Sequence, residues 1–136
     1  MKKIYYCDIS NVLLDDINLS IISNERINKT NKINLNLKKI QSLTSYLLLR
    51  YAFKNINVNL NEYEFSYINN KPFIKDLPYH FNITHSNNIV AVIISDSEVG
   101  IDCEKIDITK NLDLLINYVL SIEELKEFYA LPIILK

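Results

Sequence analysis

The sequence predicts one α+β domain over residues 1–136, in which an antiparallel sheet packs with a long helix. Two observations support this prediction. Short β-branched and aromatic runs, parted by turn residues, fill the middle of the chain, and a helical run with apolar residues at three- and four-residue spacing precedes them. A chain of 136 residues, 49% hydrophobic, is large enough for one compact core and too short for two.

The N-terminal part is expected to hold a strand and two helices. Residues 3–9, KIYYCDI, have the composition of a strand. NVLLDDINLSIIS suggests a helix with Ser10 or Asn11 as its cap. The clearest helix covers residues 35–54. Its predicted apolar face consists of Ile40, Leu43, Leu47, Leu48 and Tyr51.

The middle of the chain predicts strands, and its end predicts helices. The strand-like runs are EFSYI, KPFI, HFNITH, IVAVIIS and EVGIDCEKI, parted by NN, SNN and DSE. HFNITH and IVAVIIS should form an antiparallel hairpin through Asn87 and Asn88, with the VGIDCEK strand paired beside it. Two helices, NLDLLINYVL and SIEELKEFYA, should finish the chain.

Several classes of protein are disfavoured by composition. No apolar run approaches the roughly 20 residues that span a bilayer, and no secretion signal is visible. Cys7 and Cys103 are therefore expected to be free thiols in the cytoplasm, without a metal site built on them. A net charge of −1 and the lack of a motif that reads RNA or DNA argue against nucleic acid as a partner.

Charge is distributed unevenly along the chain. No acidic residue lies between Glu25 and Glu62, an interval that should attract a polyanion. Its basic residues are Arg26, Lys29, Lys32, Lys38, Lys39, Arg50 and Lys54. From Asp96 to Asp107 the balance reverses, and this segment should attract a cation. The alternative is two solvated faces that pair with each other.

The stretch VGIDCEK, residues 99–105, contains the only glycine of the chain. Side chains alternate along a strand, so Asp102 and Glu104 should share one surface while Cys103 points toward the core. Two such carboxylates suit Mg²⁺ held together with phosphates and water. Gly100 would allow a close approach or supply a positive φ. The alternative is an ordinary polar strand face.

Two further residues are candidates for ligand contact. His85 ends a strand and leads into a tight turn, where side chains at a sheet end can reach a ligand. Lys71 follows the NN turn. The alternatives are a turn histidine bonded to backbone and an exposed lysine with no specific role.

Taken in order, five pieces resemble the N-terminal half of 4′-phosphopantetheinyl transferases of the surfactin-synthetase-activating type. They are SNERINKTNK, LNLKKIQSLTSYLLLR, NNKPF, HFNITHS and VGIDCEK. The resemblance implies one half of a pseudo-twofold fold. It also implies transfer of the phosphopantetheine arm of coenzyme A to a serine of an acyl or peptidyl carrier protein, with Mg²⁺.

The resemblance also implies roles for individual residues. Asp102 and Glu104 match the acids that hold Mg²⁺ with the pyrophosphate, and His85 matches a histidine on coenzyme A phosphate, so these three are the catalytic candidates. Coenzyme A contacts are further expected from Arg26, Lys29, Ser42, Lys71 and Thr84, together with His85.

The chain departs from the pattern of that family at three places. Asn70 replaces a glycine and Thr84 replaces a serine. Gln41 and Ser42 lie where an arginine for phosphate is usual, so the charge and the bidentate grip of a guanidinium are lost there.

The second motif of the family, Trp-Ser-x-Lys-Glu-Ala or similar, is absent, and the chain has no tryptophan. The resemblance therefore implies a chain without the C-terminal half, and Glu124 is a weak substitute for the missing base. Three hypotheses stay open: a truncated transferase, a coenzyme A or nucleotide-binding remnant without transfer activity, and a homodimer of two such halves.

Overall fold

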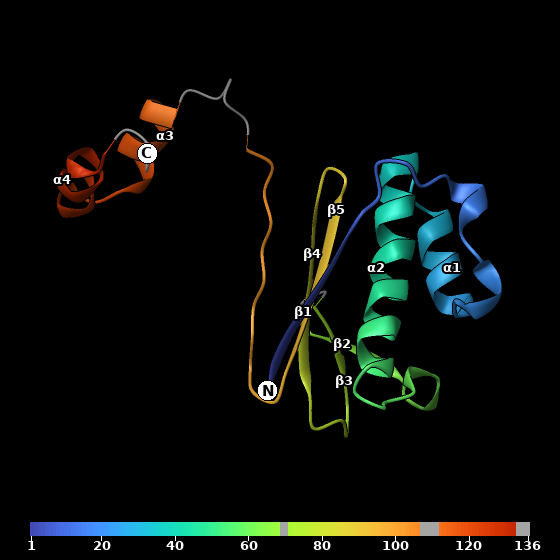
Figure 1. Cartoon of the computed structure of the whole chain (residues 1–136). Helices are drawn as coiled ribbons and strands as arrows, with labels where there is room; N and C mark the ends of the chain where they lie inside the picture. The colour runs from blue at the N-terminus through green and yellow to red at the C-terminus, as the bar shows by residue number, and fades with distance from the viewer. Residues whose placement is uncertain (69–70, 107–111, 133–136) are drawn as a thin grey trace. The chain divides into compact units, whose positions relative to one another are not determined.

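The computed structural model describes residues 1–68, 71–106 and 112–132. The chain divides into two compact units, Met1–Lys105 and Ile106–Lys136, and each is described by itself. In the first unit two helices lie on one face of an antiparallel sheet (Figure 1). The predicted turn residues Asn69 and Asn70, and Asp107 of the acidic segment, lie outside the described residues.

The main sheet has three strands in the order β1-β5-β4. The strands are β1 (Lys2–Asp8), β4 (His80–Ser86) and β5 (Ile89–Ser95), and both pairings are antiparallel. Six of the seven residues of β5 are buried, because this strand is central and covered on both faces. The unbroken apolar run IVAVIIS reflects that position. The predicted hairpin is confirmed, with Ser86 opposite Ile89.

A second sheet consists of β2 (Phe65–Ile68) and β3 (Lys71–Ile74). The two strands are antiparallel, with Phe65 opposite Ile74. Phe65 packs edge-on against Phe81 of β4 at 6.2 Å between ring centroids. This contact links the small sheet to the main core.

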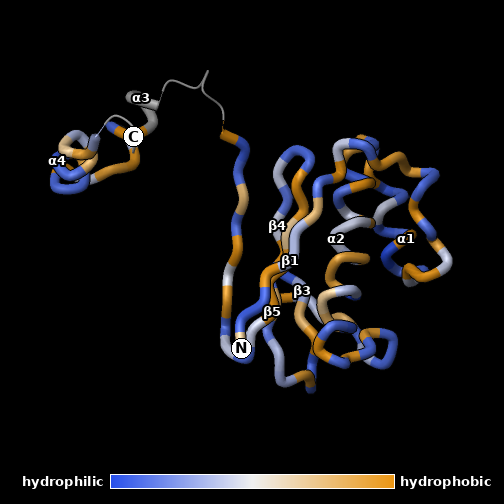
Figure 2. Tube along the Cα trace, viewed as in Figure 1, coloured by the Kyte–Doolittle hydropathy of each residue, from blue (hydrophilic) through white to orange (hydrophobic). Residues whose placement is uncertain are grey.

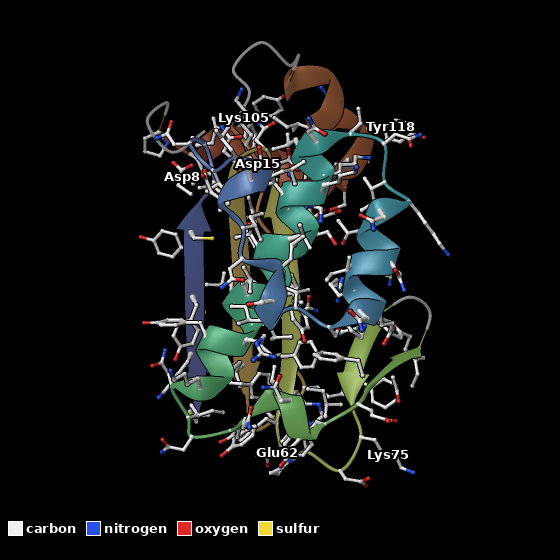
Figure 3. The ribbon with its side chains drawn as sticks, turned by 90° about the vertical axis from the view of Figure 1, so that its right-hand side faces the viewer. Asp8, Asp15, Glu62, Lys75, Lys105 and Tyr118 are labelled. Atoms are coloured by element: carbon white, nitrogen blue, oxygen red, sulfur yellow. The ribbon has the colours of Figure 1, made fainter. Side chains whose placement is uncertain are left out.

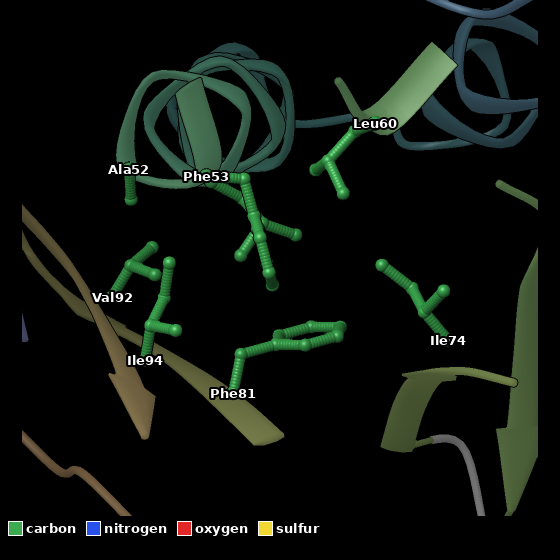
Figure 4. Packing of buried hydrophobic residues seen from close by; sticks show 8 residues of the cluster. Ala52, Phe53, Leu60, Ile74, Phe81, Val92 and Ile94 are labelled. Atoms are coloured by element: carbon green, nitrogen blue, oxygen red, sulfur yellow. The ribbon is translucent and has the colours of Figure 1, made fainter. Parts of the chain in front are cut away.

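The long predicted helix is confirmed as α2 (Asn36–Lys54), although its buried face differs from the prediction. Leu49, Ala52 and Phe53 are almost fully buried against Phe81 and β5 (Figure 4). Tyr51, predicted to be in the core, is 58% exposed. The prediction was wrong here because spacings of three and four allow a neighbouring stripe of the same helix to be chosen.

A second layer explains why α2 buries more than one stripe. The helix α1 (Asn24–Asn31), capped by the Ser23 hydroxyl, packs on the side of α2 away from the sheet (Figures 1 and 3). Leu43 and Tyr46 of α2 are buried there with Ile22. The α1 helix itself is largely hydrophilic, in contrast to the hydrophobic residues along β5 (Figure 2).

The helix expected after β1 does not form. The structure has two 3-10 turns instead, η1 (Leu14–Asp16) and η2 (Leu19–Ile21). Asp16 accepts the backbone N–H of Leu13, and Asn18 accepts the backbone N–H of Ser20. Such local side-chain bonds offer the backbone an alternative to helical bonding, which the apolar pattern alone does not reveal. A third turn, η3 (Leu60–Glu62), follows α2.

The strand expected over VGIDCEK is not present in the described structure. Residues 98–106 belong to no sheet, and residues 98–105 run past the face of the main sheet that is opposite α2 (Figure 1). Pairing beside the hairpin is therefore a wrong prediction. The segment has the composition of a strand, but its backbone N–H groups bond to side chains of β4 and not to the backbone of a neighbouring strand.

The second unit contains the two predicted C-terminal helices, α3 (Leu112–Val119) and α4 (Ile122–Ala130). The Ser121 hydroxyl caps α4, and the Glu124 carboxylate accepts the backbone N–H of Ser121 at 2.8 Å. That backbone bond, followed by the one to the Ser121 side chain, lowers the pKa of Glu124. Glu124 is thus an exposed capping residue. No helix in the described ranges has the length and apolar character to cross a membrane.

Candidate functional site

The acidic segment is fastened to β4 by two side-chain hydroxyls. Thr84 Oγ1 accepts the backbone N–H of Cys103 at 3.3 Å, and Ser86 Oγ accepts that of Lys105 at 3.3 Å. Thr84 and Ser86 are two residues apart, as are Cys103 and Lys105. Alternate hydroxyls of β4 therefore meet alternate backbone N–H groups of the acidic segment, at the spacing of an extended chain. We call this pair of contacts the hydroxyl latch.

The hydroxyl latch also fixes the Asp102 carboxylate. Its Oδ1 accepts the Thr84 hydroxyl proton at 3.0 Å and the Cys103 N–H at 2.9 Å. Asp102 and Glu104 are exposed, while Ile101 and Cys103 are half-buried. Exposure therefore alternates along the segment as predicted, although no β-ladder enforces it, and the Cys103 thiol as well as the Asp102 carboxylate lies within reach of the Thr84 hydroxyl.

The Asp102 and Glu104 side chains offer carboxylate oxygens to a cation. Carboxylate oxygens are the ligands that Mg²⁺ prefers, and Mg²⁺ is commonly held by one or two carboxylates plus substrate phosphates and water. Within the described ranges, no group of three or more His, Cys, Asp or Glu side chains gathers. The exposed carboxylates of Asp102 and Glu104 fit the arrangement in which the substrate completes the coordination.

Glu104 lines a hollow of about 420 Å³ at the end of the sheet. Asp8, Ser86 and Lys105 line the same hollow, and the sequence did not indicate Asp8 as part of it. The Asp8 carboxylate accepts the hydroxyl and, at 2.8 Å, the backbone N–H of Ser10. These bonds, the hydroxyl first, lower the pKa of Asp8. Asp8 thus adds a fixed negative charge beside Glu104.

Ser10→Ala is expected to raise the pKa of Asp8 part of the way back to its ordinary 3.8, because the hydroxyl donor is lost while the backbone donor stays. In the wild type the Ser10 bonds stabilise the fold above the ordinary pKa, and this contribution disappears as pH falls through the lowered one. A carbon-13 NMR titration of the Asp8 carboxyl measures the change. An unaltered pKa would show that the hydroxyl bond is not made in solution.

The structure shows no backbone requirement for glycine at position 100. Its φ is not positive, and a Cβ at this position would meet nothing within 4 Å. Gly100 does line a hollow of about 820 Å³ between β3 and β4, together with Lys71 and Glu98. The expectation of a positive φ is wrong. The expectation that glycine allows a close approach is not supported by any protein atom, because none lies within 4 Å of the Cβ position.

His85 lies on the other side of the sheet from Asp102. Along β4, Phe81 and Ile83 face the core under α2, whereas Thr84 faces Asp102. Alternation along the strand therefore directs His85 to the α2 side. His85 is exposed at the end of β4. The structure does not bring it together with the acids, and a ligand contacting both has to pass around the end of the strand.

Arg26 and Lys29 are held over aromatic rings. The Arg26 guanidinium lies 5.5 Å from the Tyr46 ring centroid, and the Lys29 ammonium lies 4.4 Å from that of Tyr67. Such contacts place a cation without neutralising it. In the described part of the chain the one ion pair joins the Met1 amine to Asp96. The alternative in which basic and acidic segments pair with each other is therefore wrong for these residues.

Arg50 is a further cation that the sequence placed in the acid-free interval without assigning it a role. Its guanidinium lies 5.8 Å from the same Tyr46 ring and donates to the Asn61 side chain. Two guanidinium groups from different helices thus share one buried ring. The apolar spacing of α2 gave no signal for this arrangement, because it depends on the packing of α1.

Gln41 and Ser42 make contacts within the protein. The Gln41 side-chain amide donates to the backbone carbonyl of Asn87 at 2.7 Å, and Gln41 is buried. The Ser42 hydroxyl lies 3.3 Å from that of Thr30, which joins α2 to α1. Gln41 therefore ties α2 to the β4–β5 turn. This role could not be predicted from the sequence, since it bridges residues 46 positions apart.

Comparison with known proteins finds a similarity to a transferase. The chain is 36% identical over 66 residues to the 4′-phosphopantetheinyl transferase psf-1 of Bacillus pumilus, a stretch that covers 47% of this chain and 27% of that protein. The chain thus matches about a quarter of the length of this curated relative. No family model matches the chain. The similarity supports a relationship to these transferases at the level of the superfamily.

Proposed function

We propose that the chain acts in the transfer of the 4′-phosphopantetheine arm of coenzyme A to a serine of an acyl or peptidyl carrier protein. The observation that carries the proposal is the 36% identity over 66 residues to a protein of that name. The fixed carboxylate of Asp102, which is exposed as Glu104 is, supports it.

The reaction is a substitution at phosphorus. The serine oxygen forms a bond to the phosphorus that carries pantetheine, and the bond from that phosphorus to the bridging oxygen of the pyrophosphate breaks. The leaving group is adenosine 3′,5′-bisphosphate, and the serine proton passes to a base. Such transfers depend mostly on positioning and on neutralising charge at the phosphate oxygens.

The described residues can be given parts in this chemistry. Asp102 and Glu104 would hold Mg²⁺, which supplies positive charge to the pyrophosphate when bound. Arg26 and Lys29, held over rings but without ion pairs in the described ranges, would contact the adenosine end. Lys71 and His85 remain proposed contacts of the coenzyme A phosphates. Ser42, which lies on α2, remains a proposed contact of coenzyme A.

The test is a transfer assay with the full chain. The chain is incubated with coenzyme A, Mg²⁺ and an apo carrier protein, and mass spectrometry follows the carrier serine. We expect the mass of the arm to be added, and EDTA to prevent it. Failure to transfer and failure to bind coenzyme A, measured by calorimetry with Mg²⁺, would together overturn the proposal.

Two other outcomes separate the alternatives. Coenzyme A binding without transfer would identify a binding protein and reject the transferase. Transfer whose total rate rises with the second power of chain concentration at low concentration, so that the rate per chain rises in proportion to it, would assign the activity to a homodimer. Sedimentation velocity on the same samples shows whether a dimer forms.

A further inference from the structure

We infer that Thr84 is a positioning residue for Asp102, and that it presents one particular oxygen of that carboxylate to the cation. This inference rests on the proposed function and deepens it. The Thr84 hydroxyl gives its proton to Asp102 Oδ1 at 3.0 Å. The oxygen left to face a ligand is Oδ2.

The hydroxyl of Thr84 is already committed within the protein. It has a single proton, which the bond to Asp102 uses, and it accepts the Cys103 N–H at 3.3 Å. Thr84 is also 9% exposed, so its side chain lies beneath the acidic segment. A direct contact with coenzyme A, as the family resemblance implied, would require these bonds to break.

The two oxygens of Asp102 are in different situations. Oδ1 accepts two protons, from the Thr84 hydroxyl and the Cys103 N–H, whereas Oδ2 accepts none from the described residues. Two bonds to one oxygen define the orientation of the carboxylate plane. A cation ligand held in this way loses less freedom on binding than a freely rotating side chain does.

The hydroxyl latch supplies a matched control. Ser86 holds the same segment by the same kind of bond, to the Lys105 N–H, but within the described ranges it makes no bond to a carboxylate. Removing the Ser86 hydroxyl therefore loosens the segment without releasing Asp102. Removing the Thr84 hydroxyl does both.

The experiment compares Thr84→Val, Thr84→Ser and Ser86→Ala with the wild type. Mn²⁺ replaces Mg²⁺, coenzyme A is present, and the free Mn²⁺ is measured by electron paramagnetic resonance. We expect Thr84→Val to weaken Mn²⁺ binding about 10- to 100-fold, the usual cost of losing a partner that orients a metal ligand. Thr84→Ser keeps the hydroxyl and should bind Mn²⁺ about as tightly as the wild type. Ser86→Ala should weaken Mn²⁺ binding clearly less than Thr84→Val does.

Three results would overturn the inference while leaving the proposed function intact. The first is wild-type affinity for Mn²⁺ in Thr84→Val. The second is an equal loss in Ser86→Ala, which would mean that the loosened segment is the cause. The third is weaker coenzyme A binding by Thr84→Val in EDTA, which would indicate direct contact. Absence of Mn²⁺ binding in the wild type would count against the proposed function itself. Thr84→Ala provides the comparison if the valine variant does not fold.

Discussion

Asp102→Asn is expected to lower the transfer rate by roughly 100- to 1,000-fold, the cost of removing one well-placed electrostatic group from a reacting centre. Asparagine keeps the shape of aspartate, and its carbonyl oxygen can still accept the bonds from Thr84 and Cys103 that now reach Oδ1. The amide nitrogen then replaces Oδ2. A neutral donor faces the cation in place of an anionic acceptor, so Mn²⁺ binding should fall together with the rate.

The measurements are the rate of arm transfer at saturating coenzyme A and the Mn²⁺ affinity. Asp76→Asn is the matched control, since it removes the same charge at an exposed residue in the loop after β3. Asp76 has a φ of 63°, which asparagine tolerates, so this control should fold normally. Equal losses in the two variants would show that net charge, and not the position of Asp102, determines the effect.

Phe53→Ala is expected to lower the free energy of unfolding by about 3–5 kcal/mol, the usual cost of removing a buried aromatic side chain. The Phe53 side chain is fully buried. Its ring packs edge-on against Phe81 at 5.9 Å and Tyr79 at 6.5 Å between centroids. Alanine would leave a cavity between α2 and β4, and urea denaturation would measure the loss.

Tyr51→Ala is the comparison for that variant, because the same helix loses an aromatic side chain two residues earlier. Tyr51 is 58% exposed and contacts the Tyr5 ring at 5.9 Å. A loss of about 0.5–1.5 kcal/mol, the scale of a ring pair, is therefore expected. If Tyr51→Ala destabilised the chain as strongly as Phe53→Ala, the apolar stripe suggested by the sequence would be correct and the observed one wrong.

Sequence periodicity predicted most of the elements but not the partners that select among them. The run from Asn36 to Lys54 is helical by any spacing rule, and the β4–β5 hairpin follows from its turn residues. Which stripe of α2 is buried depends on layers on both of its sides, and those layers come from distant parts of the chain. A period of three or four residues cannot record that information.

The candidate site shows the same limit. The alternation of Asp102 with Cys103 could be predicted, because it requires only an extended backbone. The attachment of that segment could not, since the bond from Thr84 joins residues 18 positions apart and uses a side chain where a β-ladder uses backbone. Placement of His85 on the far face also depends on the direction of β4, which a lone histidine in the sequence does not reveal.

The left-handed backbone positions explain how this chain folds with one glycine. Among the described residues, positive φ occurs at Asn57, Asp76 and Asn87, and not at Gly100. Asparagine and aspartate adopt this conformation more readily than other residues that carry a Cβ, so the tight turns form at modest strain. An unfolded ensemble nearly free of glycine samples fewer backbone states, and the chain gives up correspondingly less entropy when its loops become ordered.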